Sequence, residues 1–260
     1  MPNACDPLAP ARRLCHLLPM FKFRKLPDHH PDLSHSPLLR AALLALRHVQ
    51  DHGPISLTKT KAFKRVFVQW AAAHFNWPGR SHDDLFRYHK VLNEADFPPL
   101  ELLHFLLIHL KLGRHYKGEF RLTKRGADLA QSPGRLFDAL IPYYVLNIDH
   151  AAYSRFDDRP MGAWDSWLNE INVEADQGCS EHNLYAAFYS DGADWDNAGW
   201  RNIAAFSSCV LLPLEWSGLI VMPQEHTGDT RHVHHVFKTP LWRSALKLDT
   251  DDMLDPVQMH

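Results

Sequence analysis

The chain has 260 residues, of which 45% are apolar and 11% aromatic, and its 28 Lys and Arg nearly balance its 30 Asp and Glu. This is the composition of an ordinary globular protein, and it excludes a disordered, collagenous or disulfide-framework chain. At this length we expect one large or two small domains, with enough buried surface for a hydrophobic core.

Nothing in the sequence indicates a membrane or an oxidising compartment. The longest apolar stretch, residues 205–223, is interrupted by Pro213 and Glu215, so we predict no membrane span. Residues 1–19 lack the apolar core and the cleavage site of a secretory signal. The four cysteines lie in no paired spacing, which favours free thiols. We therefore expect a cytoplasmic protein without a membrane partner.

The charges are divided unevenly along the chain. Residues 1–150 carry 21 Lys and Arg and 13 Asp and Glu, a net +8, whereas residues 151–260 carry 7 and 17, a net −10. Such a division suggests a basic half that meets an anion and an acidic half that repels the anion, packs on the first half or meets a different partner. Mutual neutralisation of the two halves is the alternative.

The first elements follow a segment without pattern. Residues 1–36 show no periodicity, and we expect them to be disordered. Ser36 and Pro37 then form a typical helix start, and Gly53 is a typical helix end. Local pattern predicts three further elements, namely a strand over 55–58 and helices over 61–75 and 81–95.

The next helix, residues 99–112, is apolar nearly all round. A two-stranded hairpin is predicted after it, with Lys117 and Gly118 at the turn, and the chain then returns to helix. The order helix, strand, helix, helix, hairpin, helix is typical of a winged helix-turn-helix domain, in which the hairpin is the wing. We predict such a domain over residues 37–155, with an insertion near 76–98.

Residues 160–250 repeat this order more loosely. Predicted helices with one apolar face each come first. They are followed by an apolar helix that ends at Gly218 and by a second predicted hairpin. When Thr239 is aligned with Thr123, Trp242 falls opposite Gly126, so the similarity lies in layout and not in identity. We predict a mainly α fold with short β-hairpins, built from tandem winged helix-turn-helix domains. The second domain is acidic, Trp-rich and degenerate, with a tail over 251–260.

Four stretches of the chain carry a resemblance to a known group: residues 55–58, 93–104 and 117–126, and Leu211–Leu214 with Gly218-Leu219. They resemble an uncharacterised group of bacterial proteins often labelled plasmid-encoded or transposon-passenger proteins. The resemblance covers roughly half the chain and implies a helical winged-helix fold, but it brings no catalytic residues. The group's second wing usually exits through a Gly where this chain has Trp242.

DNA phosphates are the anion that this pattern favours. The helix before the first wing normally enters the major groove, but residues 99–112 offer only Glu101, His104, His109 and Lys111 among apolar side chains, which predicts burial and not base readout. Basic residues around the second helix and the wing suit the phosphate backbone of double-stranded DNA. The candidates are Lys59, Lys61, Lys64, Arg65, Arg114, Lys117, Arg121, Lys124 and Arg125.

We therefore predict a non-catalytic DNA-associated accessory or regulatory protein with weak sequence specificity and steep salt dependence. The alternative is a protein-interaction module or homo-oligomeric scaffold that uses its apolar third helix and its acidic half. If Lys61, Lys64, Arg65, Lys124 and Arg125 lie exposed, they favour nucleic acid. If they are salt-bridged to the acidic half, they favour the scaffold.

Catalytic and metal signatures are weak. The chain has no Gly-rich phosphate loop, nucleophile elbow or His-Glu-x-x-His motif, so we expect no enzyme and no cofactor. Its 19 histidines include three weak metal candidates on the second hairpin, His226, His232 and His234, which no Cys or carboxylate at ligand spacing completes. Histidines with pKa values near 6.5 also suggest pH sensitivity. Trp195 is a candidate contact with a protein partner.

Overall fold

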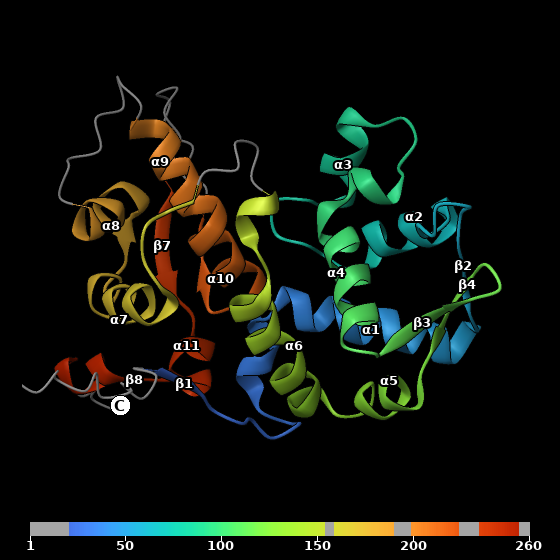
Figure 1. Cartoon of the computed structure of the whole chain (residues 1–260), viewed down its shortest axis with the longest axis horizontal. Coiled ribbons are helices and arrows are strands. Elements are labelled where there is room, and N and C mark those ends of the chain that lie inside the picture. Colours follow the sequence, from blue (N-terminus) through green and yellow to red (C-terminus); the bar gives the residue numbers. More distant parts are fainter. Residues whose placement is uncertain (1–20, 154–158, 190–198, 224–233, 255–260) are drawn as a thin grey trace, which may run out of the picture.

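The computed structural model describes residues 21–153, 159–189, 199–223 and 234–254. The chain is mainly helical with small antiparallel sheets, as the sequence predicts. Figure 1 shows that helices α6 and α10 meet between the two halves of the chain. Within the described residues, no helix combines the length and the apolar character that a bilayer crossing requires.

The first half is built from nine elements, of which one short helix and one 3-10 turn form the insertion. In chain order they are α1 (Pro37–His52), β2 (Ile55–Ser56), α2 (Arg65–His74), α3 (His82–Tyr88), a 3-10 turn (Glu94–Asp96), α4 (Pro98–His109), β3 (Gly113–Tyr116), β4 (Glu119–Leu122) and α5 (Lys124–Leu129). Strands β2, β4 and β3 form one antiparallel sheet in that order. Helix α6 (Pro133–Asn147) then leads to the second half.

Local signals set several of these boundaries. The Ser36 hydroxyl accepts a hydrogen bond from the Leu39 amide at 3.2 Å and begins α1. Lys117 and Gly118 have φ angles of 49° and 76°, the left-handed pair that a tight hairpin turn requires. The predicted start of α2 at residue 61 is wrong by four residues. The Thr58 amide donates to the Ala62 carbonyl and Lys61 is left-handed, so a turn forms where the pattern predicts helix.

The second half repeats the order of the first. Its elements are α7 (Trp164–Glu174), β5 (Cys179–Ser180), α8 (Glu181–Phe188), α9 (Gly199–Phe206), a π-helical turn (Ser207–Leu211), α10 (Leu212–Ser217), β6 (Ile220–Val221), β7 (His235–Lys238) and α11 (Pro240–Ala245). Strand order β5-β7-β6 matches β2-β4-β3, since the last strand lies in the middle of each sheet. The turn of the second hairpin lies outside the described residues.

A pair of threonines confirms this internal correspondence. The Thr123 hydroxyl donates to the Lys111 carbonyl at 2.7 Å, and its amide donates to the Leu112 carbonyl at 3.0 Å. The Thr239 hydroxyl and amide donate in the same way to the carbonyls of Gly218 and Leu219, at 2.6 and 3.0 Å. Each threonine therefore ties the exit of its hairpin to the end of the preceding helix.

The N-terminal segment differs from its prediction. Residues 21–36, the described part of the segment expected to be disordered, contain β1 (Phe21–Phe23) and a 3-10 helix (Pro31–His35). Strand β1 pairs antiparallel with β8 (Leu246–Leu248), and Leu33 is buried. No local pattern shows this order because the strand is only three residues long and its partner lies more than 200 residues away.

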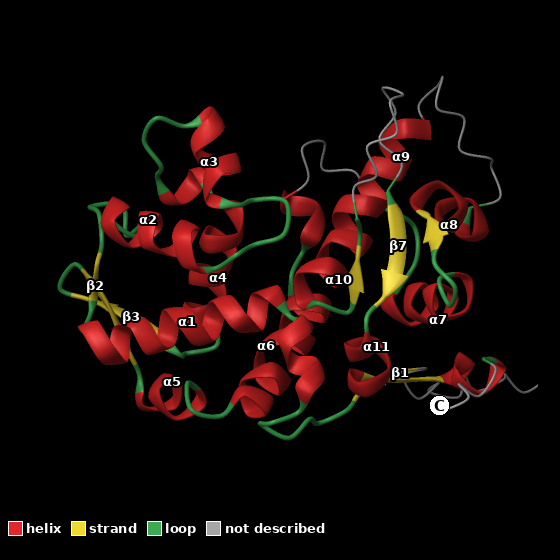
Figure 2. Cartoon of the chain, turned by 180° about the vertical axis from the view of Figure 1, so that it is seen from behind, coloured by secondary structure: helices red, strands yellow, loops and turns green. Residues whose placement is uncertain are grey.

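A single hydrophobic core runs through both halves. Helix α1 contacts α4, α6 and α10, and α10 also contacts α6, as the two opposite views show (Figures 1 and 2). Leu46, Leu103, Leu140 and Leu214 from these four helices are fully buried. The halves are therefore packed against each other, and the sheet of β2, β4 and β3 lies at the end of the molecule away from α7 and α8.

Candidate nucleic-acid interface

Two stretches of the basic half come together at the hairpin turn. The Leu57 amide donates to the Gly118 carbonyl at 2.8 Å, so the loop after β2 lies against the turn between β3 and β4. This contact places Lys59 and Lys61 in the same region as Lys117. The predicted candidates Lys59, Lys61, Lys64, Arg65, Arg114 and Lys117 are all exposed. We call this set of six residues the basic face.

The remaining three candidates behave differently. Arg121 is half-buried and ion-paired, since its guanidinium nitrogens lie 2.8 and 2.9 Å from a Glu119 carboxylate oxygen. Lys124 and Arg125 are exposed on the first turn of α5. Because α5 follows the end of β4 that is distant from the hairpin turn, they lie apart from Lys117.

Among the described residues, no ion pair joins Lys61, Lys64, Arg65, Lys124 or Arg125 to residues 159–254. The Arg65 guanidinium instead donates to the Asn93 side-chain carbonyl at 3.0 Å, within the first half. Within the described residues, these five cations are therefore exposed and not paired with the second half.

Tyr116 lies at the centre of the cations of the hairpin. Its ring is 44% exposed. The Arg114 and Arg121 guanidinium carbons lie 5.6 and 5.3 Å from the ring centre, and the Lys117 ammonium lies 5.3 Å from it. Cations at these distances are attracted by the ring quadrupole, so Tyr116 restricts the motion of these three long side chains. No sequence pattern singles out Tyr116, because its role depends on cations that the hairpin brings together.

Helix α4 is buried as predicted. Its leucines pack inward, and Glu101, Phe105 and His109 face outward at a spacing of four residues. The Phe105 ring is 37% exposed and stacks on the His109 ring, with centres 4.1 Å apart and planes at 29°. The helix in front of the hairpin therefore presents one acidic and two aromatic side chains where a major-groove helix presents long polar ones.

A carboxylate–histidine network lies between α4 and the hairpin, with Glu94 and His104 buried and His115 exposed. The Glu94 carboxylate lies 2.6 Å from His104 Nδ1 and accepts a second hydrogen bond from the Phe63 amide. His104 Nε2 lies 2.8 Å from His115 Nε2, and the His104 ring stacks on Phe63 at 3.8 Å. Burial, followed by the charges of His104 and Lys61, lowers the pKa of His115. At neutral pH the His115 ring is therefore uncharged.

The sequence gives only a partial signal for this network. His104 is a polar residue within an apolar helix, and such a residue requires a buried partner. Its partners lie 10 and 11 residues away, on the insertion and on β3. Their identity depends on the fold, so neither Glu94 nor His115 stood out in the sequence.

A groove opens beside this network. Its volume is about 410 Å³, and it lies between α4, the loop before α2 and strand β3. Its walls combine apolar, basic and titratable side chains: Thr60, Lys61, Ala62, Glu94, Glu101, His104, Phe105, Ile108, His109 and His115. The groove therefore adjoins the basic face through Lys61.

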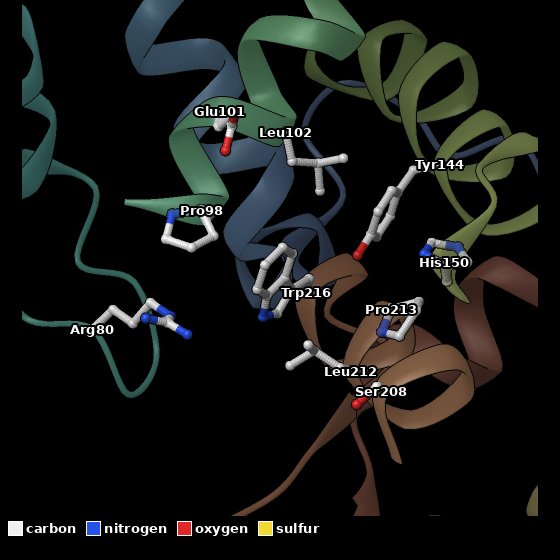
Figure 3. A pocket seen from close by; sticks show the side chains of 10 residues that line it. All are labelled: Arg80, Pro98, Glu101, Leu102, Tyr144, His150, Ser208, Leu212, Pro213 and Trp216. Atoms are coloured by element: carbon white, nitrogen blue, oxygen red, sulfur yellow. The ribbon is translucent and has the colours of Figure 1, made fainter. Parts of the chain in front are cut away.

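A second cavity lies where the two halves meet. It has a volume of about 220 Å³, and α4, α6 and α10 contribute Leu102, Tyr144 and Trp216 to its wall (Figure 3). Arg80 and Glu101 line it as charged residues, whereas burial lowers the pKa of His150, so the His150 ring is uncharged at neutral pH. None of the nine basic candidates lines this cavity, which is separate from the basic face.

The other predicted site residues do not form a site within the described residues. His226, His232 and Trp195 lie outside the part of the chain that the structure describes, and His234 is half-buried next to β7. The described ranges contain no group of three or more His, Cys, Asp or Glu arranged to hold a metal ion. Burial raises the pKa of Cys179 to about 11, so its thiol stays protonated and unreactive at neutral pH.

Comparison with known proteins places the chain in a two-domain family. The model of the Y4jL N-terminal domain matches residues 34–135, and that of the y4jL C-terminal domain matches residues 154–240. "Uncharacterized protein y4jL" of Sinorhizobium fredii (strain NBRC 101917 / NGR234) is 40% identical over 155 residues, which are 59% of this chain and 70% of the relative. The chain therefore belongs to the y4jL family. No solved structure matches it.

Proposed function

We propose that this chain is a non-catalytic DNA-associated accessory or regulatory protein that contacts phosphates through its basic face. The observation that carries the proposal is the contact between the Leu57 amide and the Gly118 carbonyl, which gathers exposed cations from two segments. These cations have no ion pair with the acidic half among the described residues. Two clusters of exposed cations on one module suit a phosphate backbone.

We further propose that the chain consists of tandem winged helix-turn-helix domains, the second degenerate. The element order and the sheet order β2-β4-β3 support this assignment for the first half, and β5-β7-β6 supports it for the second. Under this assignment α4 occupies the position of the recognition helix. Because α4 is mostly buried, its contribution to base readout is small, which agrees with weak sequence specificity.

A protein-interaction module or homo-oligomeric scaffold is the alternative function. It predicts that the basic cations serve as partners of acidic residues in the same chain or in a second copy. The exposure of Lys61, Lys64 and Arg65 in the chain favours nucleic acid over pairing within the chain. A stable dimer that does not bind DNA would support the alternative.

The test measures the salt dependence of DNA binding by the full chain. A fluorescently labelled duplex is titrated at several salt concentrations, and the anisotropy gives the affinity at each. The double variant Lys61→Gln with Lys117→Gln removes two cations from the basic face. We expect the slope of log affinity against log salt to fall by about two, because each lysine–phosphate contact contributes about one.

The matched control removes the same charge elsewhere. Lys22 and Lys247 face each other across β1 and β8 and are exposed. The double variant Lys22→Gln with Lys247→Gln should therefore leave the slope unchanged. An affinity that does not depend on salt, or equal losses in both double variants, would contradict the proposal.

A further inference from the structure

The groove beside α4 has the chemistry of a site for a nucleobase. Its apolar wall is made by Ala62, Phe105 and Ile108, while Lys61 and His115 supply polar atoms. Its volume of about 410 Å³ lies within the range of roughly 300–1,000 Å³ that small-ligand sites occupy. The groove is also continuous with the basic face, because Lys61 belongs to both.

Phe105 provides the stacking surface. Its ring is 37% exposed in the groove wall, and its stacking on His109 at 4.1 Å supports it from one side. A base of any identity is stabilised by stacking on an aromatic side chain, because every base has a π face. In a duplex each base already stacks on its neighbours, so only an unpaired base can present its face to Phe105.

The network leaves one ring nitrogen of His115 for a bound base. His104 Nδ1 is bonded to the Glu94 carboxylate and His104 Nε2 to His115 Nε2, so Nδ1 is the nitrogen of His115 that faces a ligand in the groove. The edge of an unpaired base carries both donors and acceptors, so it can pair with this nitrogen whether or not the nitrogen is protonated.

The charges around the groove determine where the phosphate backbone of a bound DNA strand can lie. Glu101 lies at the wall of the groove and repels phosphates, whereas Lys61 attracts them. Beyond Lys61 the exposed cations of the basic face continue to Lys117 and to the Tyr116 ring at the hairpin turn. A single strand that inserts one base into the groove can therefore keep its phosphates on the basic face.

We propose that the groove lined by Phe105, His109, Lys61 and His115 takes one unpaired base of single-stranded DNA, so that the chain prefers single strands over duplexes. This inference rests on the proposed function, and it names the form of DNA that the basic face holds. Helix α4 supports the preference, because it offers a major groove neither Arg nor Asn nor Gln.

The test compares a labelled 12-nucleotide DNA strand with the duplex of the same sequence, at low salt and with the full chain. We expect the single strand to bind at least about tenfold more tightly than the duplex, which is the gain in affinity expected from one stacked base. Phe105→Ala should remove most of this preference, and Phe105→Trp, which keeps an aromatic face, should retain it. Circular dichroism and thermal melting verify that each variant is folded.

Phe237→Ala is the matched control. Phe237 lies on β7 of the second half and is 40% exposed, close to the value for Phe105, so its loss should not alter the preference. Equal affinities for single strand and duplex, or wild-type preference in Phe105→Ala, would overturn the inference while salt-dependent binding still supports the proposed function. Absence of binding to both forms would overturn both.

Discussion

The two halves of the chain share an order of elements but use their charges in opposite ways. In the basic half the hairpin cations Arg114 and Lys117 face solvent, and the polar network of Glu94, His104 and His115 lies beside an open groove. In the acidic half the Lys238 ammonium is buried at the end of β7 and lies 2.8 Å from an Asp176 carboxylate oxygen. The same layout therefore gives one half an external cationic surface and the other an internal ion pair.

The aligned threonines show where this difference arises. Lys238 precedes Thr239 as Leu122 precedes Thr123, so a buried cation takes the place of an apolar side chain. The Lys238 ammonium also donates to the Asn172 backbone carbonyl at 2.6 Å, and Asn172 Oδ1 accepts from the Trp242 indole at 2.9 Å. The Lys238 ammonium therefore has three hydrogen-bond partners, two on Asn172 and one on Asp176, where the first half has the apolar Leu122. The comparison indicates that the second half uses its charge for stability.

The largest expected effect concerns this internal ion pair. Lys238→Met should lower the free energy of unfolding by about 3 kcal/mol, because it leaves Asp176 and Asn172 without their buried donor. The Lys238 side chain is only 7% exposed and that of Asp176 22%, so water replaces the lost contact only in part. Urea denaturation measures the change.

Arg243→Met is the control for this prediction. Arg243 also pairs with Asp176, at 3.2 Å, but its side chain is 47% exposed. A pair in contact with solvent contributes less than about 1 kcal/mol. If the two variants lose equal stability, the ion pair of Lys238 is not the internal support that the comparison assigns to the acidic half.

The next effect is a dependence on pH in the acidic half. Glu181 begins α8, is 9% exposed, and burial raises the pKa of its carboxyl to about 7. The folded pKa of Glu181 lies above the unfolded value of 4.5, so the protonated carboxyl contributes its full stability to the folded state below pH 4.5. This contribution is lost as the pH rises through about 7. Glu181→Gln should therefore stabilise the chain near pH 8, by up to about 3 kcal/mol, and have little effect near pH 4.5.

Melting temperatures of the wild type and of Glu181→Gln across this range provide the measurement. The difference between them should grow as pH rises from about 4.5 to 8. A difference that stays constant with pH would mean that Glu181 titrates normally despite its burial.

The basic half should respond to pH with the opposite sign. Burial lowers the pKa of His48 and of His115, with further contributions from neighbouring positive charges. A histidine whose folded pKa lies below its unfolded value of about 6.5 stabilises the fold above 6.5, and the contribution is lost as pH falls through the folded pKa. The Glu181→Gln variant lacks the opposing titration of Glu181. In this variant the melting temperature should therefore fall as pH decreases from about 7.5 to 5. A melting temperature that rises on acidification would contradict this assignment.

The smallest effect compares the two hairpin exits. The Thr123 hydroxyl donates to the Lys111 carbonyl and also accepts from the Gly126 amide at 3.0 Å, so it caps α5. The Thr239 side chain makes no capping hydrogen bond. Thr123→Val should therefore cost about 1 kcal/mol more than Thr239→Val, the value of one N-cap. Chemical denaturation of the two variants tests this difference, and equal costs would show that the caps do not distinguish the halves.

Local sequence predicts some of these features well and others poorly. The Ser36 cap and the Lys117-Gly118 turn were predictable because each depends on a few neighbouring residues and on backbone geometry. The pairing of β1 with β8 was not, because three residues carry no periodicity. The candidate interface was predicted as a set of cations, but the central position of Tyr116 and the separation of Lys124 from the hairpin turn depend on the sheet.

By itself the sequence determined the order of helices and hairpins, the repeat of that order and the division of charge between the halves. These properties follow from spacing, caps, turns and composition, which act over a few residues. The tertiary structure decided which charges stay in water and which become internal. Glu94 acquires its partners 10 and 31 residues away and Lys238 acquires Asp176 at a distance of 62 residues. Desolvation and hydrogen bonding act between atoms that the fold alone brings together, so the same hairpin layout could yield an exposed cationic face in one half and a buried ion pair in the other.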